Sequence, residues 1–174
     1  HYPLRRQRQM CIRDRQYTPL TLSPLNRRFE KLGATAEHFD MAGLDYRFRK
    51  QWLARVHVAQ LQDIYRQQVF TLVNKSPWGA GTFSSDLRLS LMNDYGNAKG
   101  GKIDNRALQG LLGYAYKGHS LGLTYQRMLG DTGYANILGT DANLINLSVL
   151  GDFANAKERS WALRYGYDLS LIHI

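Results

Sequence analysis

The chain has 174 residues, a formal charge of +9 and a mean hydropathy of -0.42. No stretch approaches the roughly 18 consecutive apolar residues of a membrane-spanning helix, and the single cysteine, Cys11, excludes an internal disulfide and a cysteine-based zinc site. The 11 Tyr and 16 Gly, against only 4 Pro, favour short strands with tight connections over a helical bundle.

Both ends of the chain differ in character from the rest. Residues 1–15 contain five arginines against one aspartate, so they carry +4 of the total charge of +9. The stretches MCIRDR (residues 10–15) and LSLIHI (residues 169–174) resemble translated sequencing-adapter read-through. We therefore predict that residues 1–15 and 171–174 are not native, and that residues 16–170 are an internal piece of a longer protein.

The first predicted pair of strands lies between residues 41 and 61. In MAGLDYRFR (residues 41–49) and WLARVHVAQL (residues 52–61), large apolar side chains alternate with more polar ones. Successive side chains of a strand point to opposite faces, and a connection of three residues, 49–51, suits a hairpin. The expected pairs are Phe48 with Trp52, Tyr46 with Ala54, and Asp45 with Arg55.

Five further strands are predicted at residues 65–74, 83–93, 106–116, 121–128 and 161–168, which gives seven in all. The second of the five contains SDLRLSLMN (residues 85–93), where the leucines share one face and the charged residues the other. Residues 76–81 are predicted to form a turn, and KGHS (residues 117–120) a four-residue turn. Across that second turn the expected pairs are Tyr116 with Leu121, Tyr114 with Leu123, and Leu112 with Tyr125.

The predicted connections alternate between short turns at one rim and long loops at the other, apart from a short link near residues 62–64. Such alternation is typical of outer-membrane barrels. The longest connection covers residues 129–160, and loops of that length usually fold over another part of the protein. Within it, DANLINLS (residues 141–148) is expected to form a short capped helix.

The apolar face is expected to contact lipid. Its aromatic residues concentrate near the turn rim, as in an interfacial girdle, and the opposite face carries charges of both signs in mid-strand. A soluble antiparallel β-sandwich or barrel that binds an anionic partner through its basic surface would show the same alternation. The pattern alone leaves this alternative open.

Four stretches resemble OprD-type outer-membrane porins: LQDIYRQ (residues 61–67), HFDMAGLDYR (residues 38–47), LGLTYQRMLGD (residues 121–131) and KERSWALRYGYDLS (residues 157–170). The similarity extends over most of residues 26–170. It implies part of an all-β antiparallel transmembrane barrel of roughly 16 to 18 strands in the bacterial outer membrane. It also implies passive, selective diffusion of small charged solutes, which are basic amino acids, small peptides or carboxylates, without enzymatic activity or a cofactor.

The resemblance places none of the family's arginine ladder or constriction loop on residues of this chain, so the site predictions rest on the alternation. The arginines of the wet face would attract carboxylates and its aspartates the cationic end of a zwitterion, although ion pairs within the wall explain them equally well. The predicted lumen-facing residues are Asp45, Arg47, Arg55, His57, Asp86, Arg88, Gln109, Gln126, Arg164 and Asp168. The predicted lipid-facing residues are Leu44, Tyr46, Phe48, Trp52, Val56, Leu87, Leu89, Leu91, Leu112, Tyr114, Tyr116, Leu123, Trp161 and Tyr165.

Other motifs have simpler explanations. GNAKGGK (residues 96–102) is close to a phosphate-binding loop, but Ile103 stands where a magnesium-binding Ser or Thr is required. No metal site is expected, because the histidines lack metal-ligand spacing. The prediction also includes no nucleic-acid partner. The basic stretch at residues 27–31 is either a solvated loop or a contact with lipopolysaccharide phosphates.

Overall fold

A computed structural model describes residues 20–21, 34–137, 143–148, 151 and 153–168. The terminal segments set apart above, residues 1–15 and 171–174, and the basic stretch at residues 27–31 lie outside the described residues. Among the described residues, no helix has the length and apolar character needed to cross a membrane.

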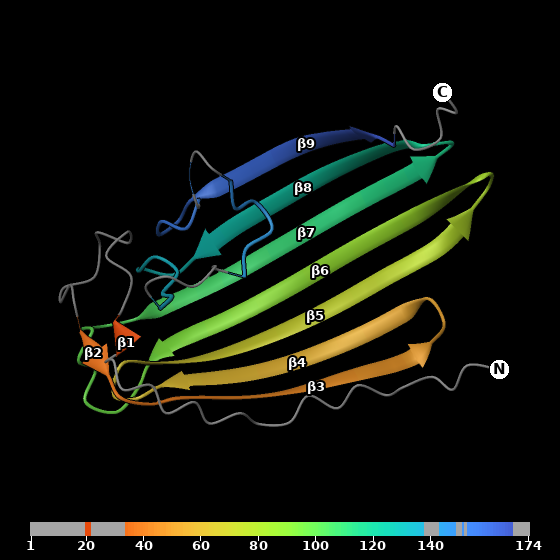
Figure 1. Cartoon of the computed structure of the whole chain (residues 1–174). Helices are drawn as coiled ribbons and strands as arrows, with labels where there is room; N and C mark the ends of the chain where they lie inside the picture. The colour runs from red at the N-terminus through yellow and green to blue at the C-terminus, as the bar shows by residue number, and fades with distance from the viewer. Residues whose placement is uncertain (1–19, 22–33, 138–142, 149–150, 152, 169–174) are drawn as a thin grey trace.

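Seven antiparallel strands form one sheet, in which each strand pairs with its neighbour in the chain (Figure 1). The two short strands β1 (Leu20–Thr21) and β2 (Thr35–Ala36) pair separately. The seven strands are β3 (Phe39–Arg49), β4 (Trp52–Leu61), β5 (Tyr65–Trp78), β6 (Gly81–Asp94), β7 (Asp104–Tyr116), β8 (His119–Leu129) and β9 (Arg159–Tyr167). The predicted all-β antiparallel fold with seven main strands is confirmed.

The register keeps the two faces of the sheet distinct across all seven strands. Directly opposed residues share a face, so each row of Cα partners belongs to one side. One polar row runs Asp45, Arg55, Thr71, Arg88, Gln109, Gln126 and Ser160. A row one residue along is mainly apolar and runs Tyr46, Ala54, Leu72, Leu87, Gly110, Tyr125 and Trp161.

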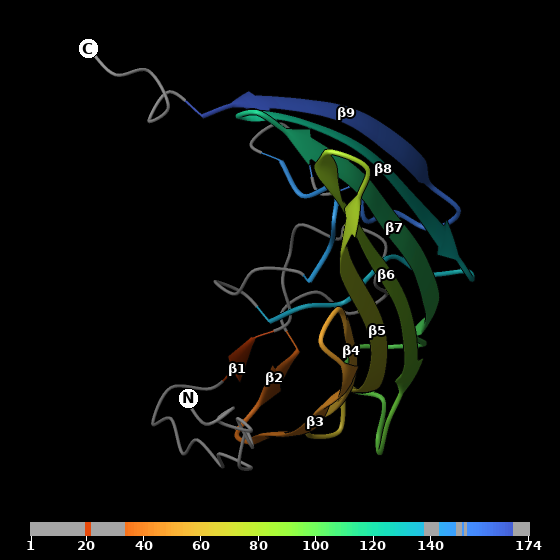
Figure 2. The same cartoon turned by 90° about the vertical axis from the view of Figure 1, so that its right-hand side faces the viewer.

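The sheet is curved, and β1, β2 and the described residues between β8 and β9 lie on its concave side (Figure 2). Sheets twist and coil because of backbone sterics, and a barrel wall has this curvature. The polar row faces the concave side, where Gln109 and Gln126 are almost fully buried beneath the chain that follows β8. The apolar row faces the convex side, where Trp161 is 74% exposed and Leu87 48% exposed.

The hairpin turns are tighter than the sequence suggested. β7 and β8 are joined by Lys117 and Gly118 alone, both with positive φ (47° and 81°), as a two-residue type I′ turn requires. The four-residue turn was therefore wrong, and the observed pairs are Tyr116–His119, Tyr114–Leu121 and Leu112–Leu123. Because the slip is two residues, every side chain keeps its predicted face.

Two other local expectations are corrected. The turn predicted at residues 76–81 shrinks to Gly79 and Ala80, because β5 and β6 continue pairing as far as Trp78 and Gly81. The pairs Asp45–Arg55 and Tyr46–Ala54 are confirmed, but the register then shifts and Trp52 pairs with Arg49. Phe48 still stacks on Trp52, with ring centroids 6.0 Å apart, because both rings lie on the convex face.

The hydrophobic core lies on the concave side near the loop rim. Its sheet residues are buried by residues of the loops and of β2, so it joins the wall to the chain that covers it. The buried members are Ala36, Leu61, Ile64, Tyr65, Met92, Ile103, Ala107, Met128, Tyr134, Ala135, Ile137, Leu144 and Ala154.

Candidate functional site

The segment between β8 and β9 lies over the concave polar row. We call its described residues, 131–137, 143–148, 151 and 153–158, the inner segment. At its start, Asn105 Nδ2 donates to the carbonyl oxygen of Thr132 at 2.8 Å, and the Asp104 amide donates to Thr132 Oγ1 at 2.9 Å. Further along, Gln67 on β5 donates to the Tyr134 hydroxyl. These contacts turn the chain inward across the wall instead of outward into solvent.

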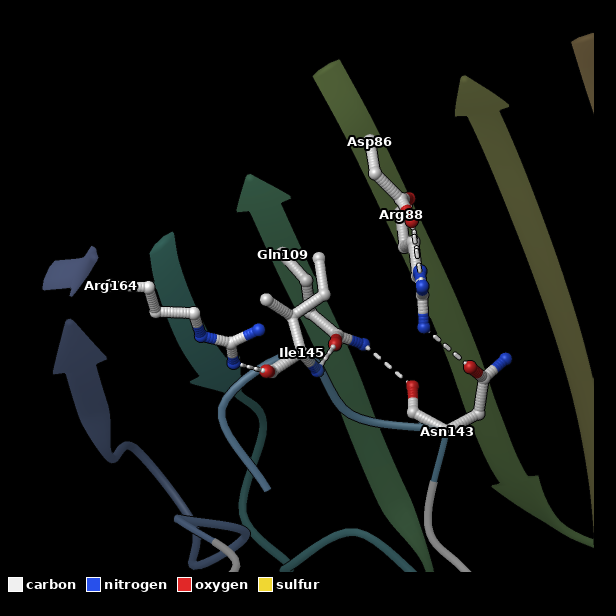
Figure 3. Close-up of polar contacts among 6 residues, drawn as sticks. All are labelled: Asp86, Arg88, Gln109, Asn143, Ile145 and Arg164. Atoms are coloured by element: carbon white, nitrogen blue, oxygen red, sulfur yellow. Dashed lines mark hydrogen bonds and ion pairs between the residues drawn. The ribbon is translucent and has the colours of Figure 1, made fainter. Parts of the chain in front are cut away.

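Gln109 on β7 holds the middle of the inner segment (Figure 3). Its Oε1 accepts the Ile145 amide at 2.8 Å, and its Nε2 donates to the carbonyl oxygen of Asn143 at 3.4 Å. Arg88 on β6 reaches the same place and donates from Nη1 to Asn143 Oδ1 at 2.6 Å. One glutamine therefore satisfies two backbone groups that a peptide segment cannot leave unpaired when buried.

Gln126 on β8 provides a second attachment of the same kind. Its Oε1 accepts the Asn146 amide at 3.2 Å, and its Nε2 donates to the carbonyl oxygen of Phe153 at 2.9 Å. Asn146 Nδ2 donates to Ser160 Oγ at 2.9 Å, and Arg164 donates to the carbonyl oxygen of Ile145. Four neighbouring strands, β6 to β9, thus bind one short stretch of the inner segment.

These contacts explain why the helix expected at residues 141–148 is absent from the described part, residues 143–148. Residues 145–146 form a turn, and Ser148 makes an isolated bridge with Gly151. The amides of Ile145 and Asn146 bond to glutamine side chains of the sheet rather than to carbonyls of a preceding helical turn. The prediction was wrong because local capping signals carry no information about these distant acceptors.

Ion pairs along the concave wall account for most of its predicted charges. Arg55 Nε lies 3.1 Å from Asp45 Oδ2, and His57 Nε2 lies 3.5 Å from the other oxygen of the same carboxylate. Arg88 forms a bidentate pair with Asp86, in which Nη2 donates to Oδ2 at 2.6 Å and Nε donates to Oδ1 at 3.0 Å. Arg164 differs, because no described carboxylate lies within ion-pairing distance and its hydrogen bond goes to a neutral carbonyl.

Comparisons with known proteins identify the family. Residues 13–174 match the protein family described as "outer membrane porin, OprD family". The chain belongs to the OprD family of porins. Porin-like protein GalP of Pseudomonas putida is 28% identical over 148 residues, which are 84% of this chain and 36% of that protein.

Solved structures of Pseudomonas aeruginosa porins show the same arrangement of strands. The crystal structure of OccK10 (OpdN) superposes with a TM-score of 0.88 and is 39% identical, covering 92% of this chain and 46% of that one. OccK11 (OpdR) gives a TM-score of 0.85 at 44% identity, covering 88% of this chain and 42% of that one. The chain spans about a third of the length of the curated relatives it matches.

Membership of the OprD family decides between the two interpretations of the alternating faces. OprD porins are outer-membrane barrel channels of bacteria and not enzymes, so the predicted family, location and non-enzymatic character are confirmed. The alternative of a soluble β-sandwich does not fit, because the family to which the chain belongs is one of outer membrane porins.

The structure places the predicted lumen-facing and lipid-facing residues as follows. Arg47 lies near the end of β3 and donates to the carbonyl oxygen of Lys50 in the β3–β4 turn, and Asp168 follows β9. The other predicted lumen-facing residues lie on the concave face: Asp45, Arg55, His57, Asp86, Arg88, Gln109, Gln126 and Arg164. Of the predicted lipid-facing residues, all are exposed except Trp52 and Leu91, which are half-buried.

Sequence reasoning missed the inner-segment residues that meet this face. Asn143, Asn146 and Tyr134 contact the sheet directly, together with Gln67 and Ser90 beneath them. A signal was present in the amide side chains of DANLINLS, which suit contacts with a polar wall as well as they suit a helix end.

Tyr134 should make the inner segment sensitive to alkali. It is 2% exposed, and burial raises its pKa above the ordinary tyrosine value, although Ser90, Gln67 and Arg88 oppose the shift. A raised pKa means that the stability contributed by the neutral phenol is complete below about pH 10 and is lost as the pH rises through the shifted pKa.

We therefore expect Tyr134→Phe to remove this alkaline loss, at a cost of about 1 kcal/mol for the missing hydrogen bond at neutral pH. Thermal unfolding of the closed barrel at about pH 8 and about pH 11 checks both effects. The difference between the wild-type and variant absorbance spectra isolates the phenolate of Tyr134. This signal should appear only at a higher pH than the one at which the exposed tyrosines ionise. Ionisation of Tyr134 together with the exposed tyrosines would contradict the expected shift.

Proposed function

We propose that this sheet forms one side of a water-filled passage through a closed barrel, and that the inner segment narrows the passage where small charged solutes cross. The observation that carries the proposal is the attachment of the inner segment to the concave polar row by Gln109 and Gln126. A buried peptide segment fixed by side chains of the wall reduces the cross-section permanently, whereas a loop in solvent does not.

The charges of the concave face favour solutes that carry a carboxylate. Asp45 and Asp86 are already paired with arginines of the wall, which reduces their attraction for a cation. Arg164 has no carboxylate partner among the described residues, and its side chain is exposed on the concave face of the sheet. A guanidinium in this position can bind a carboxylate by two parallel hydrogen bonds. Basic amino acids and small peptides would use the same group through their own carboxylates.

Single-channel conductance in a planar bilayer tests the proposal, with the closed barrel that contains these strands. Benzoate, lysine and a neutral dipeptide are added in turn as competing solutes. We expect discrete conductance steps that benzoate interrupts at lower concentration than lysine does. Arg164→Gln should weaken the benzoate effect about two- to fivefold, as for a solvent-exposed charge pair.

The matched control for this experiment is Arg159→Gln, because Arg159 lies on the same strand and faces the convex side. It should leave the benzoate effect unchanged in a phospholipid bilayer. An equal loss in both variants would show that net charge, rather than a contact in the passage, sets the preference. The absence of conductance steps in the correctly folded barrel would refute the passage itself.

A further inference from the structure

Arginines occupy the loop-side end of the convex face on three neighbouring strands. Arg106 lies near the start of β7, Arg127 near the end of β8, and Arg159 begins β9. The next convex residues toward the turn rim are apolar or aromatic: Leu108, Tyr125 and Trp161, all exposed. The lipid-facing band therefore changes abruptly from apolar to cationic at this level of the wall.

The register brings the three guanidinium groups together. Arg127 lies directly opposite Arg159, and Arg106 lies opposite Leu129, which makes it the diagonal neighbour of Arg127. Like charges in directly opposed positions destabilise a sheet unless something neutralises them. This cluster, Arg106, Arg127 and Arg159, is the outer arginine cluster.

No described acidic residue neutralises the outer arginine cluster. The nearby Asp131 pairs with Lys157 at 3.1 Å, and Glu158 accepts hydrogen bonds from Asn155. None of the salt bridges between described residues includes a member of the cluster. At the turn rim, the convex ends of β7 and β9 carry tyrosines instead, namely Tyr116, Tyr165 and Tyr167.

We propose that the outer arginine cluster binds phosphate groups of lipopolysaccharide in the outer leaflet. Long loops of outer-membrane barrels lie on the extracellular side, so this rim meets the headgroups of that leaflet. Guanidinium groups bind phosphate oxygens in bidentate geometry, and three of them around one anion remove their mutual repulsion. A further arginine, Arg66, lies on β5 at the same rim, with its Cζ atom 4.9 Å from the centroid of the Tyr95 ring.

The test measures lipopolysaccharide binding by the purified closed barrel, independently of conductance. Arg127→Gln/Arg159→Gln is compared with Lys50→Gln/Lys117→Gln, which removes the same charge from the turn rim. Folding of each variant is checked by its heat-dependent mobility on gels. We expect the arginine variant to bind about tenfold more weakly or worse, and the lysine variant to bind like the wild type.

Two further arms use the wild type and need no variant to fold. Lipopolysaccharide stripped of its phosphates should bind about tenfold more weakly than the intact lipid. Inorganic phosphate, added at the same total negative charge as the intact lipid, should not displace that lipid. Equal binding of the stripped lipid would assign the contact to acyl chains and overturn the proposal. Displacement by inorganic phosphate, or unchanged binding in the arginine variant, would overturn it as well.

Discussion

Leu89→Arg should prevent the barrel from assembling in the membrane. Leu89 lies in the middle part of β6 on the convex face and is 39% exposed, opposite Phe70 and Leu108 on the neighbouring strands. An arginine facing the bilayer midplane costs about 2–4 kcal/mol, a large part of the stability of an ordinary domain. Membrane fractionation and the heat-dependent gel mobility of the folded barrel measure the loss.

The neighbouring residue provides the control, because Arg88 is adjacent in sequence and faces the opposite side. Arg88→Leu leaves Asp86 without its partner but places no charge against lipid, so assembly should continue while solute preference changes. A second control, Val73→Arg, introduces the same side chain on the concave face directly opposite Asp86. If Leu89→Arg assembled as well as Val73→Arg, the assignment of the convex face to lipid would fail.

Removal of both tethering glutamines should open the passage. Gln109→Ala/Gln126→Ala takes away the acceptors of the Ile145 and Asn146 amides and leaves both amides buried without partners. Each lost attachment should lower the free energy of local opening of the inner segment by about 1–3 kcal/mol. Faster hydrogen exchange at the Ile145 and Asn146 amides and a larger, noisier single-channel conductance are the expected results.

Two convex glutamines serve as the matched control. Gln60 and Gln68 belong to the opposite side of β4 and β5, away from the inner segment. Gln60→Ala/Gln68→Ala should leave both the exchange rates and the conductance unchanged. A conductance increase of equal size in this control would indicate a general loosening of the wall rather than release of the inner segment.

The sequence by itself determined the two faces and the seven strands. A strand places alternate residues on opposite sides whatever its partners are, so the leucines and charges around Arg88 indicated their faces without any knowledge of neighbours. It could not determine the turn at Lys117 and Gly118, because a register slip of two residues leaves the alternation unchanged. That turn depends on positive φ at two positions, which only the backbone reveals.

Only the tertiary structure decided where the inner segment lies. Its attachment joins Gln109 to Ile145 and Arg88 to Asn143, residues that are 36 and 55 positions apart. The local pattern of DANLINLS suggested a capped helix, since capping depends on near neighbours. In the folded chain, the amides of Ile145 and Asn146 meet buried glutamine oxygens of the curved wall, and these distant partners set their conformation.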